Sequence, residues 1–392
     1  MLASAGVSRD FSSLWCLDPT VAYLNHGSFG ACPRAVLEVQ EALRRELERE
    51  PVAFLAEGLT ARLNAARVAL AAFVGASAAD LVFVPNATTG VNSVLRSLSF
   101  APGDELLVTT HTYAACRNAV EFVARESGAR IVVAALPFPV GSDTEILAAI
   151  LDQVSARTRL ALIEHVTSPT ALVLPIARLV AELKARGVET LVDGAHAPGM
   201  VPLALDALGA AYYTGNAHKW MCAPKGAAFL HVRADRHAGL HALVTSHGYD
   251  RGLQAEFDWT GTMDPTPYLC IPAAIETIGG LLPGGWPEVM ARNHALVMRA
   301  RTLVLDALGV AAPAPESMIG SLASIPLPAA APGSPADGLD TDALGAFIRA
   351  RGVRTWLYPQ PRPLVRLSAQ LYNRIEEYAR LAELLREALG RG

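Results

Sequence analysis

Ionisable and amide side chains gather in the stretch that runs from TLVD to NAHKW. Asp193 and His196 follow the apolar run TLV, while Asn216, His218 and Lys219 follow a second strand-like segment, AAYYTG. A lysine partly removed from water has a lowered pKa and can form a Schiff base with an aldehyde. A carboxylate that faces a pyridine nitrogen favours the protonated ring, which then accepts electrons. Together these residues predict chemistry of the pyridoxal phosphate type.

The phosphate of such a cofactor needs a cradle of hydrogen-bond donors. The segment PNATTGVN, residues 85–92, follows the apolar run LVFV and leads into a helical pattern. Backbone N–H groups at a helix start suit a dianion, and the hydroxyls of Thr88 and Thr89 add two further donors. We therefore expect the phosphate at this turn.

Short apolar runs must position these side chains. Continuous apolar strands are covered on both faces, as in a mainly parallel sheet, where ligands bind beyond the carboxyl ends of the strands. The segments between the runs have the length and period of helices, which indicates repeated βαβ units. The predicted strands are 81–84, 105–110, 130–136, 159–166, 190–193 and 227–232, with AAYYTG as a further strand-like segment.

Helices are expected on both sides of this region. The residue pattern predicts them at 33–50, at 59–75 with Gly75 as the end, at 269–282 and at 286–308. The Pro- and Gly-rich segment 328–338 is predicted to be a loop, with Asp340 or Thr341 capping the next helix. We expect an N-terminal segment (1–22), a large cofactor domain (23–270) and a small C-terminal domain (271–392).

Composition excludes several other classes of protein. Of 392 residues, 52% are hydrophobic and 18% charged, and the formal net charge is -4. This predicts a folded protein with no general attraction to nucleic acid or anionic membranes. Charge or glycine interrupts every apolar run, and the N-terminus does not resemble a secretory signal. Five cysteines without CxxC spacing predict reduced thiols, a cytoplasmic location and no metal site.

Seven ordered motifs resemble the class V aminotransferases of pyridoxal-phosphate fold type I, and most of all their isopenicillin N epimerase-like group. The resemblance implies a mainly parallel seven-stranded sheet covered by helices on both faces, and a smaller α+β C-terminal domain. The motifs are YLNHGSFG at 23–30, NATTG at 86–90, HVTSPTA at 165–171, DGAH at 193–196, NAHKW at 216–220, WTGT at 259–262 and VRLSAQLYN at 365–373.

This resemblance implies a role for each matching residue. Lys219 would hold pyridoxal 5'-phosphate, Asp193 would pair with its pyridinium nitrogen, and Tyr113 would stack on its face. Arg366 would bind the α-carboxylate of an amino-acid substrate, and Thr262 would reach the phosphate in a neighbouring subunit of a homodimer. The remaining implied contacts are His196 and Ser168 with the phenolic oxygen, Ala87, Thr88, Asn216 and His218 with the phosphate, and Asn25 and His26 with the substrate.

Three outcomes remain open for such an enzyme. The first is an epimerase or racemase, in which Lys219 serves one face of the substrate and Tyr113 or His26 serves the other. The second is a C–S lyase, of the kind that acts on hercynylcysteine sulfoxide. The third is an aminotransferase, and a non-catalytic binding protein is a further alternative that the intact motif residues disfavour.

Two differences between this sequence and the families it resembles reduce the number of possible reactions and substrates. Cysteine desulfurases need a nucleophilic thiol shortly before the carboxylate-binding arginine. Here that stretch, RTWLYPQPRPLVR, contains no cysteine, and Trp356, Leu357 and Tyr358 stand in it. Met263 also occupies a position where the epimerase-like group usually has arginine. We therefore disfavour persulfide chemistry and expect a substrate whose side chain is apolar or contains sulfur.

Overall fold

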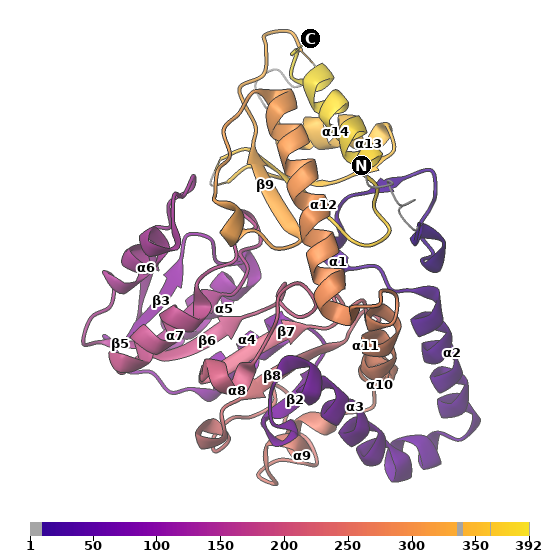
Figure 1. The fold of residues 1–392 in the computed structure, drawn as a ribbon. Helices are drawn as coiled ribbons and strands as arrows, with labels where there is room; N and C mark the ends of the chain where they lie inside the picture. The colour runs from indigo at the N-terminus through magenta and orange to yellow at the C-terminus, as the bar shows by residue number, and fades with distance from the viewer. Residues whose placement is uncertain (1–9, 335–339, 361, 392) are drawn as a thin grey trace.

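A seven-stranded sheet forms the centre of the molecule (Figure 1). The computed structural model describes residues 10–334, 340–360 and 362–391. The strand order is β2-β8-β7-β6-β5-β3-β4, and only β8 runs antiparallel to its neighbours. The strands are β2 (Leu81–Val84), β3 (Glu105–Thr109), β4 (Arg130–Ala134), β5 (Thr158–Glu164), β6 (Glu189–Asp193), β7 (Tyr212–Asn216) and β8 (Ala228–Val232).

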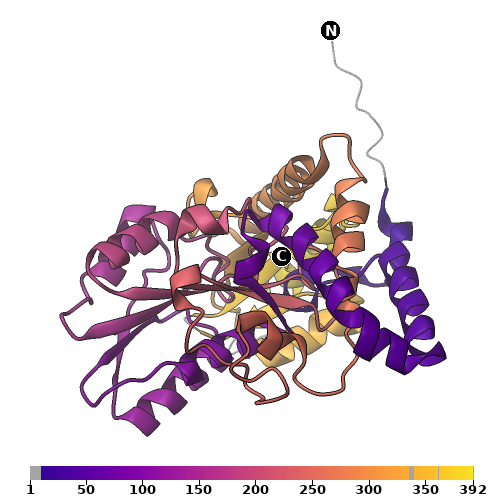
Figure 2. The same ribbon diagram turned by 90° about the horizontal axis from the view of Figure 1, so that it is seen from below.

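Each predicted apolar run is a strand, and AAYYTG supplies β7. Successive side chains of a strand point to opposite faces, so a run that is apolar throughout buries both faces. In β5, Leu160 and Leu162 pack on the face covered by α4 and α5, whereas Ala161 and Ile163 pack on the face covered by α6 and α7. Figure 2 shows the sheet lying between these two helical layers. The predicted doubly covered, mainly parallel sheet is confirmed.

The helices also follow the sequence pattern closely. Gly75 ends α3 in the left-handed conformation, as expected, and Asp340 caps α13 by accepting from the Asp342 N–H. The helix predicted over 269–282 is shorter, because Gly279 and Gly280 end it early. The helices are α1 (His26–Phe29), α2 (Arg34–Arg49), α3 (Leu59–Val74), α4 (Ala87–Ser97), α5 (Ala114–Ser127), α6 (Asp143–Leu151), α7 (Ile176–Ala185), α8 (Leu205–Leu208), α9 (Leu253–Asp258), α10 (Thr266–Leu269), α11 (Ile271–Gly279), α12 (Gly285–Leu308), α13 (Thr341–Ala350) and α14 (Ile375–Ala388).

A second, antiparallel sheet lies in the C-terminal part of the chain. It has the order β11-β12-β9, formed by Trp356–Tyr358, Leu364–Ser368 and Leu322–Pro326. The long helix α12 packs against β9 and α14. Near the N-terminus, β1 (Ala22–Tyr23) pairs in parallel with β10 (Val353–Arg354). This pairing holds the residues that follow β1 beside β12. The loop predicted over 328–338 lies partly outside the described residues.

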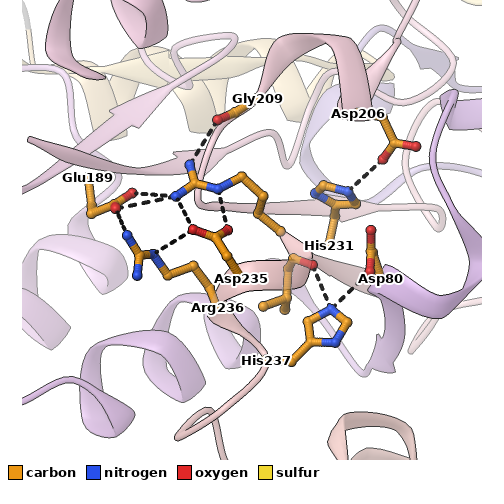
Figure 3. A network of polar contacts seen from close by, with 10 residues as sticks. Asp80, Glu189, Asp206, Gly209, His231, Asp235, Arg236 and His237 are labelled. Atoms are coloured by element: carbon orange, nitrogen blue, oxygen red, sulfur yellow. Dashed lines mark hydrogen bonds and ion pairs between the residues drawn. The ribbon is translucent and has the colours of Figure 1, made fainter. Parts of the chain in front are cut away.

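The two edges of the large sheet carry different chemistry. At the edge where β6 begins, Glu189 forms ion pairs with Arg233 and Arg236, and the side chain of Asp206 lies 3.1 Å from His231 Nε2 (Figure 3). The partly exposed ion pairs of Glu189 join the start of β6 to the residues after β8, and the Asp206 contact joins α8 to β8. At the opposite edge, all parallel strands present their carboxyl ends, and most of the predicted site residues lie there. Within the described part of the chain, no helix is long and apolar enough to cross a membrane.

Candidate active site

A cavity of about 280 Å³ opens at the carboxyl ends of the parallel strands. The segments that follow β2, β3, β5, β6 and β7 line it, together with α1 and the second sheet. The structure thus brings ten of the predicted site residues to one cavity: Ala87, Thr88, Tyr113, Ser168, Asp193, His196, Asn216, His218, Lys219 and Arg366.

Lys219 lies in the turn after β7, and its Nζ is 3.3 Å from His196 Nε2. The indole N–H of Trp220 donates to His196 Nδ1 at 3.4 Å, so the neutral imidazole carries its hydrogen on Nε2 and directs it at the lysine. Burial lowers the pKa of Lys219 to about 8, and Arg366 acts in the same direction. Burial and the Lys219 charge hold the pKa of His196 well below its ordinary value. The pair therefore offers an amine that is readily deprotonated.

Asp193 ends β6 and is 4% exposed. Its Oδ1 accepts the backbone N–H of Ala195 at 3.0 Å, and its Oδ2 accepts from the Cys116 thiol at 3.4 Å. Both oxygens are thereby held in fixed directions at the floor of the cavity. A buried carboxylate of this kind favours a cationic partner.

The start of α4 forms another wall of the cavity. Asn86 caps the helix by accepting from the N–H and hydroxyl of Thr89, while Asn216 accepts the N–H of Ala87 at 2.8 Å. Ala87 and Thr88 of the first turn face the cavity. His218 Nδ1 is 2.8 Å from the Ala227 carbonyl, which fixes the ring at the same wall. A helix start with hydroxyl and amide donors suits a phosphate.

Arg366, in β12, is 1% exposed. One of its terminal nitrogens donates to the Ser168 carbonyl and the Tyr358 hydroxyl, and the other donates to the Ser28 hydroxyl and Asn25 Oδ1. These acceptors are neutral. Among the described residues no carboxylate forms an ion pair with Arg366, and its Nε has no hydrogen-bond partner. A buried guanidinium that lines a cavity without a counter-ion is suited to an anionic ligand.

Four predicted residues lie outside the cavity lining. His26 is fully buried, with Nδ1 2.9 Å from the Tyr372 hydroxyl and Nε2 3.0 Å from the Lys219 carbonyl. Asn25 reaches the site only through Arg366 and Ser28. Thr89 serves the cap of α4, and Thr262 is exposed. The imidazole of His26 thus supports the backbone of Lys219.

Other residues of the cavity wall were not singled out as site residues from the sequence. Phe29 and Trp356 stand at the cavity and are 61% and 42% exposed, and Tyr358 lies deeper beside Arg366. Glu164, the last residue of β5, is 2% exposed and also lines the cavity. The sequence could have identified Glu164, because it is an acidic residue at the end of an apolar run. No comparable feature of the sequence marks the aromatic residues as part of the cavity wall.

The residues present fit pyridoxal phosphate. The cavity offers a readily deprotonated amine, a fixed carboxylate and a helix start that faces the same space. The guanidinium of Arg366 is left for a further anion. This donor set matches an aldehyde, a pyridinium nitrogen, a phosphate and a substrate carboxylate.

Comparisons with known proteins agree with this chemistry. The family model Aminotransferase class-V matches residues 31–260. The chain is 37% identical to isopenicillin N epimerase of Amycolatopsis lactamdurans, over 95% of this chain and 96% of the relative. It is 31% identical to L-cysteine desulfhydrase of Arabidopsis thaliana, over 94% and 87% of the two chains.

Solved structures show the same fold. A cystine C–S lyase in complex with cysteine persulfide superposes with a TM-score of 0.79 at 21% identity, covering 94% of this chain and 97% of the other. A cysteine desulfurase from Thermococcus onnurineus gives 0.80 at 19% identity, with 98% and 99% covered. The predicted family and fold type are confirmed. The chain is therefore an enzyme that uses pyridoxal 5'-phosphate, and it belongs to the class-V aminotransferase family.

Proposed function

We propose that the protein is an amino-acid epimerase or racemase that acts at the α-carbon. One observation carries this proposal: Lys219 and Tyr113 line the same cavity from the ends of β7 and β3, with β6 and its Asp193 between them in the sheet. Inversion at carbon needs one group that removes a proton and another that supplies a proton from the opposite side. The two side chains provide such a pair.

Lys219 suits the removal of the α-proton, and Tyr113 suits the donation of a proton from the opposite side. When bound, pyridoxal phosphate stabilises negative charge at the α-carbon. Lys219, with its pKa lowered to about 8, removes the α-proton. Burial raises the pKa of Tyr113, so its phenol keeps its proton and serves as the acid. His26 is excluded from this role in our proposal, because both ring nitrogens contact other groups away from the cavity.

Substrate and cofactor contacts complete the proposal. Arg366 binds the α-carboxylate through its two terminal nitrogens. Asn25 and Ser28 orient one of these nitrogens, and Ser168 and Tyr358 orient the other. Asp193 would hold the pyridinium nitrogen, and His196 and Ser168 would contact the phenolic oxygen. The phosphate is bound by Ala87, Thr88, Asn216 and His218 at the start of α4, with Thr89 stabilising that start through its contact with Asn86.

A C–S lyase is the second candidate. Relatives that bear the name L-cysteine desulfhydrase support it. The cavity wall of Phe29, Trp356 and Tyr358 supports it too, because the described residues that line the cavity include no arginine besides Arg366. Such a wall suits a short, apolar or sulfur-bearing side chain. Elimination also needs only one base, so Tyr113 would be dispensable for it.

One experiment separates the candidates. The purified holoenzyme is incubated in heavy water with a panel of L-amino acids and cysteine conjugates, and chirality, α-hydrogen exchange and pyruvate are measured together. The epimerase proposal predicts D-isomers with α-deuterium, and a Tyr113→Phe variant that still exchanges the α-hydrogen but inverts slowly. Pyruvate and ammonia from cysteine conjugates, undiminished in Tyr113→Phe, would establish the lyase instead.

A homodimer with shared sites is part of the proposal. Thr262 and Met263 are exposed in the turn after α9, and neither lines the cavity of its own chain. In a twofold-symmetric dimer, such a turn is free to reach the partner's site. We also retain the cytoplasmic location as a prediction from the reduced cysteines.

A further inference from the structure

Two carboxyl side chains meet at the floor of the cavity. Glu164 ends β5 and Asp193 ends β6, and the two residues are paired in register across these parallel strands. Neighbouring strands lie about 4.8 Å apart, and residues in register point to the same face. Both side chains line the cavity, and they are 2% and 4% exposed. Only Asp193 has a role in the proposed function.

Hydrogen bonding distinguishes the two groups. Each oxygen of Asp193 accepts one hydrogen bond, from Ala195 N–H and from the Cys116 thiol. Glu164 Oε2 accepts from the Thr109 hydroxyl at 3.2 Å, but its Oε1 has no hydrogen-bond partner among the described residues. A buried carboxylate oxygen without a donor is unfavourable, whereas a protonated carboxyl group needs fewer donors. A proton held by this pair therefore belongs on Glu164.

The charged surroundings point the same way. The groups that face Glu164 are Asp193 from β6, Cys116 from α5 and the hydroxyls of Thr109 and Thr112 at the end of β3, and Lys219 lies across the cavity. Burial, followed by the negative charge of Asp193, raises the pKa of Glu164 to about 7.

We propose that Glu164 is a positioning residue of the cofactor site, which carries a proton beside Asp193 and so limits the buried pair to one negative charge in the free protein. When a cationic ring nitrogen lies against Asp193, Glu164 releases this proton to solvent, and the pair then carries two charges. The residue thus adjusts the charge of the site to its occupant. This inference uses the proposed cofactor contact of Asp193 but is independent of the reaction that follows.

The first test uses the cofactor-free protein and therefore involves no catalysis. The melting temperatures of wild type and Glu164→Gln are compared between pH 5 and pH 8.5. In the wild type, an acid whose folded pKa is raised above its unfolded value loses stability as pH rises from about 4.5 to about 7. The glutamine variant lacks this loss, so its melting temperature should rise relative to wild type across that interval. Glu48→Gln, on the exposed side of α2, controls for replacing a carboxyl by an amide.

The second test measures cofactor binding by titration with pyridoxal phosphate. Glu164 attracts a cationic ring only when ionised, so the variant should bind increasingly weakly relative to wild type as pH rises. We expect the ratio of the two dissociation constants to be at least about fivefold larger at pH 8.5 than at pH 5.5. The inference would be overturned if neither the difference in melting temperature between wild type and Glu164→Gln nor the ratio of their dissociation constants changed with pH. This holds whatever reaction the enzyme catalyses.

A third measurement uses the wild-type protein alone, so it remains possible if the Glu164→Gln variant does not fold. Infrared difference spectra of the wild-type, cofactor-free protein should show a protonated buried carboxyl group at pH 6 that is lost by pH 8.5. If no such band titrates in this interval, Glu164 is ionised throughout and the inference is wrong.

Discussion

Replacing Arg366 with lysine tests how the site binds its substrate. The guanidinium has two terminal nitrogens held in place by Ser168, Tyr358, Ser28 and Asn25. A fork of this kind binds a carboxylate with two parallel hydrogen bonds, and an ammonium group supplies a single point charge. The substitution therefore removes at least one charge-assisted hydrogen bond to the α-carboxylate.

The expected loss follows from the strength of such bonds. Hydrogen bonds to charged groups contribute about 1.5–3 kcal/mol each, and loss of orientation adds to this, so we expect about 2–4 kcal/mol in total. That corresponds to a fall in kcat/KM of about 30-fold to 1,000-fold. The assay is steady-state turnover together with substrate affinity, measured from the absorbance change of the holoenzyme.

Two controls isolate the carboxylate contact. Arg354→Lys changes a partly exposed arginine in the neighbouring β10, whose guanidinium donates to the Arg349 carbonyl, and should leave kcat/KM within about twofold. An amine that lacks the α-carboxylate should bind wild type and Arg366→Lys about equally. A fall of less than threefold with the amino acid, or an equal fall with the amine, would refute the assigned role.

Three further predictions concern the cofactor. Lys219→Ala should lose the absorbance band of the covalently held cofactor while its circular dichroism stays unchanged; a persisting band would contradict the assignment. Only the neutral amine attacks an aldehyde, so the rate of covalent attachment of the cofactor should rise with pH and level off above about 8, where Lys219 is deprotonated. Stopped-flow mixing at several pH values measures this rate, and a rate that does not depend on pH would contradict the prediction. If Thr262 acts across a dimer, mixing equal amounts of Lys219→Ala and Thr262→Ala subunits should recover about a quarter of wild-type turnover. Random exchange makes about half of the dimers mixed, and each mixed dimer has one of its two sites intact. No recovery would place Thr262 outside the partner's site.

Much of the fold could be predicted because the local pattern and the tertiary structure agree. LVFV and TLVD are apolar throughout, and strands buried on both faces require such runs. The polar residues after these runs were correctly expected to gather, because parallel strands end at one edge of the sheet. Here the sequence alone was sufficient to predict that Asp193 and Lys219 lie together at one cavity.

Other parts of the site depended on tertiary structure. His26 stands next to Asn25 in the sequence, yet the direction of its ring is set by Tyr372 and the Lys219 carbonyl, which only the folded chain brings near. Glu164 stands out as an acidic residue at the end of an apolar run, but its importance arises from its register with Asp193 across two strands. No local pattern encodes which residues face each other in a parallel sheet.

The contact between Asn25 and Arg366 spans 341 positions of the chain and has a consequence for biosynthesis. Domains generally fold as they emerge from the ribosome, starting with the N-terminal part. Strand β6, which ends at Asp193, and strand β7, which precedes Lys219, emerge before β12. A nascent chain can therefore assemble this part of the cavity while Arg366 is still untranslated. A premature stop codon after β8 would therefore yield a polypeptide with Lys219 but without Arg366, the residue proposed to bind the substrate carboxylate.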